Sequence, residues 1–270
     1  MIESSLALAW PRLRKNALWV AIVAAIYMLA MAYMLPLNAS MAKPPITAAA
    51  LGHLYAQLAP PLLLVLVASF AIRFLSLGEA ARARIAEFRW TPGSVAALVG
   101  WLLLVSVGVL FVVSLASLIV LVPALLLILS HAGLHGKTAA QSPAVIGATV
   151  LIMLATVIPM AIWLGTKIAL LEASYVLGER SNPIGASWKL TDGNFWETFG
   201  FYALYMLVGF GILIVSLGIG KLFASLSPLL VLVGDFLQIV GSIWLQFAFA
   251  EGMVAWTVML REAKAAGRQG

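Results

Sequence analysis

The stretch VAALVGWLLLVSVGVLFVVSLASLIVLVPALLLILS, residues 95–130, carries no charged side chain and decides the class of protein. A helix that crosses the hydrocarbon core of a bilayer needs about 20 predominantly apolar residues. This stretch is longer, and as a single helix it would reach about 54 Å at 1.5 Å per residue. It predicts membrane-spanning structure, either as one tilted helix bent near Pro123 or as two tightly connected spans.

The whole chain has the composition of a membrane protein. Of its 270 residues, 63% are hydrophobic and 10% are charged, whereas soluble domains have roughly 45–50% and about 25%. One soluble domain cannot bury this excess, so lipid must cover it. The apolar runs predict spans at about 17–37, 54–74, 95–130, 144–172, 195–220 and 229–260. We therefore expect an all-α, polytopic helical bundle of about six transmembrane helices, with residues 1–270 forming a single membrane domain.

The placement of lysine and arginine predicts the orientation, because the cytoplasmic loops of membrane proteins are enriched in them. With six spans and a cytoplasmic N-terminus, 12 of these residues lie inside and 3 outside, whereas splitting the run 95–130 gives 9 against 6. Six spans with both termini cytoplasmic is therefore the favoured arrangement. The first apolar run is longer than the apolar region of a signal peptide, so we expect it to be a retained helix.

A basic amphipathic segment lies between the second and third predicted spans. Leu77, Ala81, Ile85 and Phe88 recur at helical spacing, while the charged residues fall elsewhere on the helical wheel. The Thr-Pro-Gly sequence at 91–93 ends the pattern. This predicts a cytoplasmic interfacial helix on the inner leaflet. Such a helix serves either as a contact for anionic lipid or a partner, or only as a connector that obeys the charge rule.

The segment between the fourth and fifth predicted spans, residues 181–196, reads SNPIGASWKLTDGNFW. Asn182 can cap a helix whose first residue is Pro183, because proline lacks the N–H that would be unpaired there. Gly193 suits the end of that helix, and Asn194 can cap the next one. We therefore expect a short helix and a corner before the fifth span.

This segment resembles part of a bacterial family of membrane domains. The family occurs fused to some glycerophosphoryl diester phosphodiesterases and as stand-alone, uncharacterised relatives, and the preceding Glu172 also fits it. The resemblance implies a six-helix fold in the inner membrane with a cytoplasmic corner. It does not imply phosphodiesterase activity, which belongs to a separate soluble domain. The residues that carry the resemblance are Pro183, Ala186, Ser187, Trp188, Leu190, Thr191, Gly193, Phe195 and Trp196.

Polar side chains form stripes along two of the predicted spans. Ionisable and polar groups inside a membrane are costly and are therefore candidates for function. Two such stripes either line a path for a polar headgroup, an ion or a small solute, or hydrogen-bond between helices as packing. The stripe on the fourth span consists of Thr149, Thr156 and Lys167, and the stripe on the sixth span of Asp235, Gln238, Ser242, Gln246 and Thr257.

Two charged residues are expected at similar depth near the inner leaflet, Lys167 and Glu251. They either form an ion pair, or Lys167 extends its ammonium group to the inner surface. Glu172 follows Lys167 by five residues, which is a poor spacing for a pair within one helix.

Gly200, Gly211 and Gly218 fall on one side of the fifth predicted span. A strip of glycines allows a neighbouring helix to approach closely in a membrane. The sequence therefore predicts helix packing along this strip.

The remaining residues restrict the chemistry. The chain has no cysteine, which excludes disulfides and thiolate sites. His131 and His135 have the spacing of a shared metal site, and His53 is also expected outside, but no carboxylate accompanies them, so we expect solvated histidines and no metal.

We find no motif of catalysis or cofactor binding. We therefore expect a non-enzymatic inner-membrane protein that associates with lipids or other membrane proteins, with a homo-oligomer also open. We expect no cofactor and no nucleic acid. The alternative is a transporter or carrier that uses the two polar stripes.

Overall fold

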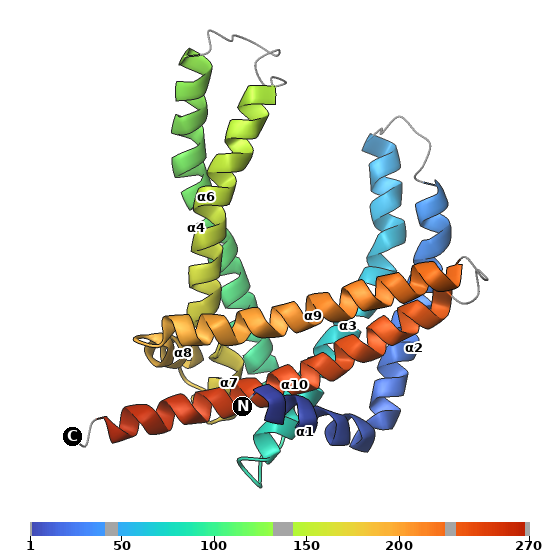
Figure 1. Cartoon of the computed structure of the whole chain (residues 1–270), viewed down its shortest axis with the longest axis vertical. Helices are drawn as coiled ribbons and strands as arrows, with labels where there is room; N and C mark the ends of the chain where they lie inside the picture. The colour runs from blue at the N-terminus through green and yellow to red at the C-terminus, as the bar shows by residue number, and fades with distance from the viewer. Residues whose placement is uncertain (1, 41–47, 132–142, 225–230, 268–270) are drawn as a thin grey trace. The chain divides into compact units, whose positions relative to one another are not determined.

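A computed structural model describes residues 2–40, 48–131, 143–224 and 231–267, and every regular element in these ranges is a helix. The all-α prediction is therefore confirmed (Figure 1). The helices are α1 (Ile2–Lys15), α2 (Ala17–Ser40), α3 (Ala48–Arg82), α4 (Pro92–His131), α6 (Pro143–Ile168), α7 (Leu171–Val176), α8 (Pro183–Thr191), α9 (Phe195–Ala224) and α10 (Val231–Ala266).

Within the described residues, five segments are long and apolar enough to cross a membrane, and a sixth is counted if α1 and the first part of α2 form one bent span. This is the make-up of a multi-pass membrane protein. The run 95–130 belongs to the single continuous helix α4, so the two-span alternative does not apply. The five segments are Leu58–Arg82, Pro92–Ala124, Val150–Val176, Phe195–Ile219 and Val233–Ala266.

The helices group into two compact units. One unit holds α1, α2, α3, α10 and most of α9, and the other holds α4, α6, α8 and most of α7. By residue number, the first unit comprises Met1–Arg89, Val176–Gly178 and Phe199–Gly270, and the second comprises Trp90–Tyr175 and Glu179–Thr198.

Helix α10 is the element around which the first unit packs. It contacts α1, α2 and α3, and it runs obliquely across them in Figure 1. Of its most apolar window 56% is buried, compared with 17% in α3 and 11% in α9. Ile243, Phe247 and Val254 are among its buried core side chains. Polar residues on α10 are therefore placed where they meet other helices.

Helix α1 is an amphipathic element that the sequence analysis did not predict. Ser5, Ala9 and Leu13 recur every fourth residue and are buried, whereas Leu8 and Trp10 are exposed. The buried side packs against α10. The chain then bends by 89° between α1 and α2.

The prediction of a separate amphipathic helix around residues 77–88 is wrong. Helix α3 continues without a break to Arg82, and turns follow before α4 begins. Leu77 and Ala81 are buried, and so is Glu79, which the helical wheel placed on the polar side. The apolar spacing therefore reflects burial of the end of α3 inside its unit.

The glycine strip predicted on the fifth span does not serve close packing. A Cβ atom at Gly200, Gly211 or Gly218 would meet no heavy atom within 4 Å in the part of the chain that the structure describes. The prediction took spacing on one helix as a sign of contact, but the side chains of the facing helix decide where backbones come close.

Close approach between α9 and α10 occurs instead at two glycines of α10. A Cβ on Gly241 would lie 2.8 Å from Cγ2 of Ile212, and one on Gly252 would lie 2.5 Å from Oη of Tyr205 and 2.8 Å from Cζ of Phe201. Large side chains of α9 thus fill the space that these glycines leave open.

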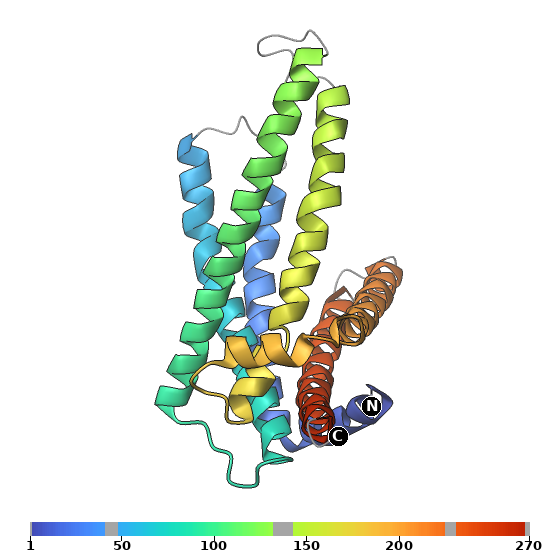
Figure 2. The ribbon, with the colours of Figure 1, turned by 90° about the vertical axis from the view of Figure 1, so that its left-hand side faces the viewer.

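In the second unit, α4 and α6 form the long pair, and α8 packs against α6 (Figure 2). The most apolar window of α4 has no buried residue. Leu110 and Phe111 are 70% and 66% exposed. The Tyr175 hydroxyl donates a hydrogen bond of 2.9 Å to the carbonyl of Ser94, which ties α7 to the start of α4.

Candidate functional site

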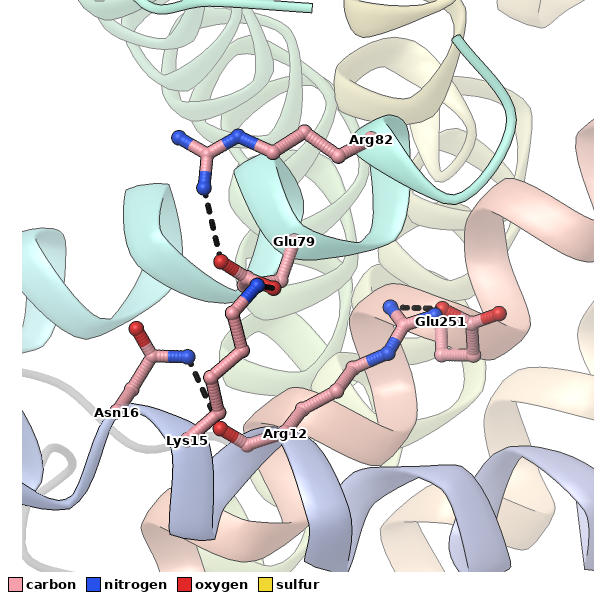
Figure 3. A network of polar contacts seen from close by, with 6 residues as sticks. All are labelled: Arg12, Lys15, Asn16, Glu79, Arg82 and Glu251. Atoms are coloured by element: carbon pink, nitrogen blue, oxygen red, sulfur yellow. Dashed lines mark hydrogen bonds and ion pairs between the residues drawn. The ribbon is translucent and has the colours of Figure 1, made fainter. Parts of the chain in front are cut away.

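Five charged side chains come together where α1, α3 and α10 meet (Figure 3). The Arg12 guanidinium forms an ion pair with the Glu251 carboxylate. Nζ of Lys15 and Nη1 of Arg82 lie 3.0 Å and 2.8 Å from the two carboxylate oxygens of Glu79. Residues Glu79 and Glu251 are only 7% and 4% exposed. The cluster therefore neutralises two buried carboxylates with cations from α1 and α3.

The ion cluster holds the N-terminal helix in place. A buried carboxylate without a partner is strongly destabilising, so the position of Arg12 fixes α1 against α10. Two further contacts support the same arrangement. The hydroxyls of Ser5 and Tyr205 form a hydrogen bond, and the Asn16 amide donates 2.9 Å to the carbonyl of Arg12 at the bend between α1 and α2.

Lys167 and Glu251, for which the sequence left an ion pair open, each have a partner within their own unit. Glu251 pairs with Arg12, and Lys167 pairs with Asp192 at 3.3 Å. The expectation compared depths along two spans. It did not include α1, whose folding against α10 places Arg12 beside Glu251.

An open hollow of about 350 Å³ lies beside the ion cluster. The Lys15 and Arg82 side chains are 66% and 46% exposed, so both reach solvent or headgroups. Three cationic side chains and one carboxylate face this space, which makes it electropositive. Its lining residues are Pro11, Arg12, Lys15, Glu79, Arg82 and Ala83.

A second hollow, of about 230 Å³, lies between α2, α3 and α10. The structure brings Gln238, Ser242 and Gln246 together along its wall, as their spacing of four residues predicts. Its lining residues are Tyr27, Ile72, Gln238, Ile239, Ser242, Ile243 and Gln246.

The other members of the two polar stripes do not line this hollow. Thr257 is fully buried and donates a hydrogen bond of 2.8 Å to the Met253 carbonyl. Thr156 donates 2.6 Å to the carbonyl of Ile152 in its own helix. Asp235 is half-buried, and the side chain of Thr149 lies outside those that the structure describes. The two threonine hydroxyls are therefore satisfied locally.

The helix boundaries of the corner at residues 181–196 largely follow the prediction. Asn182 caps α8, with its side-chain oxygen accepting from the Gly185 N–H at 2.8 Å, and Pro183 is the first helical residue. Gly193 has φ +81° just after the helix. Asn194 precedes α9 as expected, but its amide donates 3.3 Å to the Leu190 carbonyl, so its side chain interacts with α8.

Two buried hydroxyls lie inside the corner, and that of Ser187 fixes α8 against the end of α6. Oγ of Ser187 donates 2.8 Å to the Lys167 carbonyl and accepts 3.1 Å from the Leu170 N–H. Thr191 donates to the carbonyls of Ser187 and Trp188, both at 3.0 Å. Both side chains are fully buried. Ser187 thus joins two helices, whereas Thr191 bonds within α8.

Lys167 completes the corner. Its Nζ lies 3.3 Å from Oδ1 of Asp192 and 5.5 Å from the centre of the Trp188 ring. The edge of Trp163 packs against that ring with 5.3 Å between centroids. Glu172 in α7 is also buried. The cation is thus held by a carboxylate and an aromatic face.

The remaining residues of the corner segment divide between core and surface. Pro183 and Leu190 are buried, whereas Trp196 is 74% exposed and stacks edge-on with Phe195. Ala186 is half-buried within α8.

No family model, curated protein or solved structure matches the chain. Within the described ranges, no three histidine or carboxylate side chains lie close enough to hold a metal. The predictions at His53, His131 and His135 lie outside the described residues and side chains. Sequence reasoning missed Arg12, Glu79 and Tyr27 as site residues. The signal available in the sequence for α1 was the spacing of four residues between Ser5, Ala9 and Leu13.

Proposed function

We propose that this chain is a non-enzymatic, multi-pass component of the bacterial inner membrane that associates with lipids or with other membrane proteins. Helix α4 carries the proposal. It has 40 residues, and none of its most apolar window is buried within the chain. Exposed apolar patches of this size mark contacts with membrane or protein. The resemblance of the corner segment to a family of membrane domains supports the same kind of role.

The use of the polar residues also supports an accessory role. The groups from which an active site would be built are engaged in holding helices together. Ser187 joins α8 to α6, Thr191 bonds within α8, and Arg12 and Glu251 join α1 to α10. We therefore assign these residues to the fold and the apolar faces to the function.

The cytoplasmic placement of both termini rests on charge and on α1. A basic amphipathic helix lies in the membrane interface, where its cations meet anionic headgroups. Helix α1 bends by 89° from α2, exposes Trp10, and brings Lys15 beside Arg82 at an electropositive hollow. These features fit the inner leaflet.

Copurification tests the main proposal. The protein is purified from native membranes in a mild detergent and analysed by native mass spectrometry. We expect stoichiometric phospholipid or a second membrane protein to remain bound. Recovery of a folded protein with neither would overturn the association.

Labelling tests the orientation, because the chain has no cysteine of its own. We expect Arg14→Cys and Ala266→Cys to react with a membrane-impermeant maleimide only after cells are permeabilised. Lys137→Cys, in a loop expected outside, serves as the control that reacts in intact cells. Labelling of the first two in intact cells would contradict the proposed topology.

A carrier of a lipid or small solute is the second candidate, favoured by the hollow that Gln238, Ser242 and Gln246 line. A carrier of a water-soluble substrate needs this hollow to open to water. Ser242→Cys should then react with a charged thiol reagent in membranes, while Thr156→Cys gives the background. Without such reactivity, this candidate is limited to substrates that enter from the lipid.

A further inference from the structure

The hollow between α2, α3 and α10 contains polar groups that the described chain does not satisfy. No hydrogen bond within residues 2–40, 48–131, 143–224 and 231–267 engages the side-chain amides of Gln238 and Gln246. Both residues belong to a candidate membrane span. A polar group in hydrocarbon costs several kcal/mol if it has no partner. Both residues are half-buried, so their amides are available to hydrogen-bond an occupant of the hollow.

The lining of the hollow limits the charge of that occupant. None of its seven lining residues is ionisable at neutral pH, since Tyr27 is a neutral phenol that hydrogen-bonds Ser69. An ion in such a site would be desolvated without a counter-charge. The lining therefore selects against phosphate, carboxylate and ammonium groups.

The apolar part of the lining points to an amphipathic molecule. Ile72, Ile239 and Ile243 are buried residues that face the same space as the two amides. Ser242 is exposed at the hollow's edge, and the surrounding helices α3 and α10 are membrane candidates. A ligand can therefore enter sideways from the lipid with an apolar body and a polar end.

Hydrogen-bond chemistry specifies the polar end. An amide side chain offers both a donor and an acceptor, and a hydroxyl group uses both, whereas a carbonyl or ester uses only the donor. The hollow holds the volume of about eight water molecules, taking about 30 Å³ for each. This is enough for a glycerol-sized group.

We propose that this hollow binds the hydroxyl-bearing end of an uncharged membrane lipid. The inference rests on the proposed association with lipids and names the lipid class at one site. Gln238 and Gln246 hold the hydroxyl, and the three isoleucines contact the adjoining apolar part.

Three lipids that contain the dioleoylglycerol unit test the ligand class, with its hydroxyl free, esterified by a third oleoyl chain, or esterified by phosphate. Purified protein is mixed with dioleoylglycerol, trioleoylglycerol or dioleoyl phosphatidic acid, and bound lipid is measured by native mass spectrometry. We expect dioleoylglycerol to bind at least tenfold better than the other two. Equal binding of trioleoylglycerol would remove the role of the hydroxyl, and equal binding of phosphatidic acid would remove the selection against charge.

Variants locate the binding in the hollow. Gln238→Leu and Gln246→Leu should each reduce binding of dioleoylglycerol at least tenfold. Thr156→Val is the matched control, since it also removes a polar group from a span but leaves the hollow intact. Unchanged binding in both glutamine variants would overturn the site.

Thermal unfolding without added lipid separates a binding role from packing. If the amides serve to bind a ligand and make no contact between helices without it, Gln246→Leu leaves the unfolding temperature unchanged or raises it. If the amides instead hydrogen-bond between helices, the unfolding temperature of Gln246→Leu falls, and the proposal fails.

Loss of this inference and loss of the proposed function give different results. If phospholipid copurifies but dioleoylglycerol shows no preference, only the ligand class at the hollow is wrong. If neither phospholipid nor a membrane protein copurifies, the proposed association itself fails.

Discussion

Two of the buried charges that anchor helices, Glu251 and Lys167, have differently exposed partners. In the first unit, the Arg12 and Glu251 side chains are 15% and 5% exposed, so both members of the ion pair are withdrawn from solvent. In the second unit, Lys167 is 8% exposed, but its partner Asp192 is 77% exposed. The pair of Arg12 and Glu251 is buried between two helices. In the pair of Lys167 and Asp192, the buried cation contacts a carboxylate at the surface of the corner.

This difference predicts which pair the fold depends on. Breaking a buried pair leaves an uncompensated charge and costs about 3–5 kcal/mol, whereas an exposed pair contributes about 0.2–1 kcal/mol. The α1–α10 junction therefore depends on charge neutralisation. The α6–α8 corner depends on the hydroxyl bonds of Ser187, with the ion pair as a minor contribution.

The largest effect is expected for Arg12→Met. It leaves the Glu251 carboxylate buried without its cation and should lower the free energy of unfolding by about 3–5 kcal/mol. Equilibrium unfolding in mixed micelles measures the change. Arg14→Met, which removes an exposed arginine from the same helix, is the matched control and should have little effect.

The double variant Arg12→Met with Glu251→Leu checks the cause. Replacing both members of a buried pair by apolar groups is often neutral, so most of the lost stability should return. A double variant as unstable as Arg12→Met alone would show that the packing of α1, rather than the charge, decides the junction.

The next effect is expected in the corner, for Ser187→Ala. It removes the buried partner of the Leu170 N–H and of the Lys167 carbonyl. Each unsatisfied group costs about 1–3 kcal/mol, so we expect a loss of about 2–4 kcal/mol in unfolding free energy. The same measurement applies.

Ser117→Ala is the control for that change. Its hydroxyl donates only to Val113 in its own helix, at 2.7 Å. It should change stability by less than about 0.5 kcal/mol, as substitutions away from such features do. Equal losses in both serine variants would mean that the corner is not specially dependent on Ser187.

Much of the secondary structure follows from local sequence. The absence of charge in residues 95–130 predicts membrane-spanning helix, the placement of lysine and arginine favours one span over two, and Asn182-Pro183 predicts the start of α8. These features depend on neighbours in the chain. They are therefore readable without knowledge of the tertiary structure.

The partners of the polar residues could not be predicted in the same way. Arg12 and Glu251 lie near opposite ends of the sequence, and their pairing depends on α1 folding against α10. The spacing of Gln238, Ser242 and Gln246 predicts a shared side, but the hollow exists because Tyr27 and Ile72 come from other helices. Periodicity predicts which side chains share one side of a helix. It does not predict which residues of other helices pack against that side.

A smaller loss of stability is expected for Gly252→Ala, which disturbs the packing of α9 against α10 in the first unit. Gly252→Ala would place Cβ 2.5 Å from Oη of Tyr205, so the α9 side chains must shift. Overpacking of this kind typically costs about 1–3 kcal/mol. Gly218→Ala meets no atom within 4 Å and is the control, with stability unchanged or slightly higher because alanine favours helix. Thermal unfolding of both variants measures the difference.

The smallest effect is expected for Asp192→Asn, which removes the exposed member of the second pair. The cost should be about 0.2–1 kcal/mol, because solvent screens the carboxylate and the Trp188 face still attracts the ammonium group of Lys167. Screening also predicts that the difference from the unmodified chain shrinks at high salt. Unfolding at low and high salt therefore compares the two junctions directly, since the effect of Arg12→Met should persist. A loss for Asp192→Asn as large as that for Arg12→Met would contradict the distinction between them.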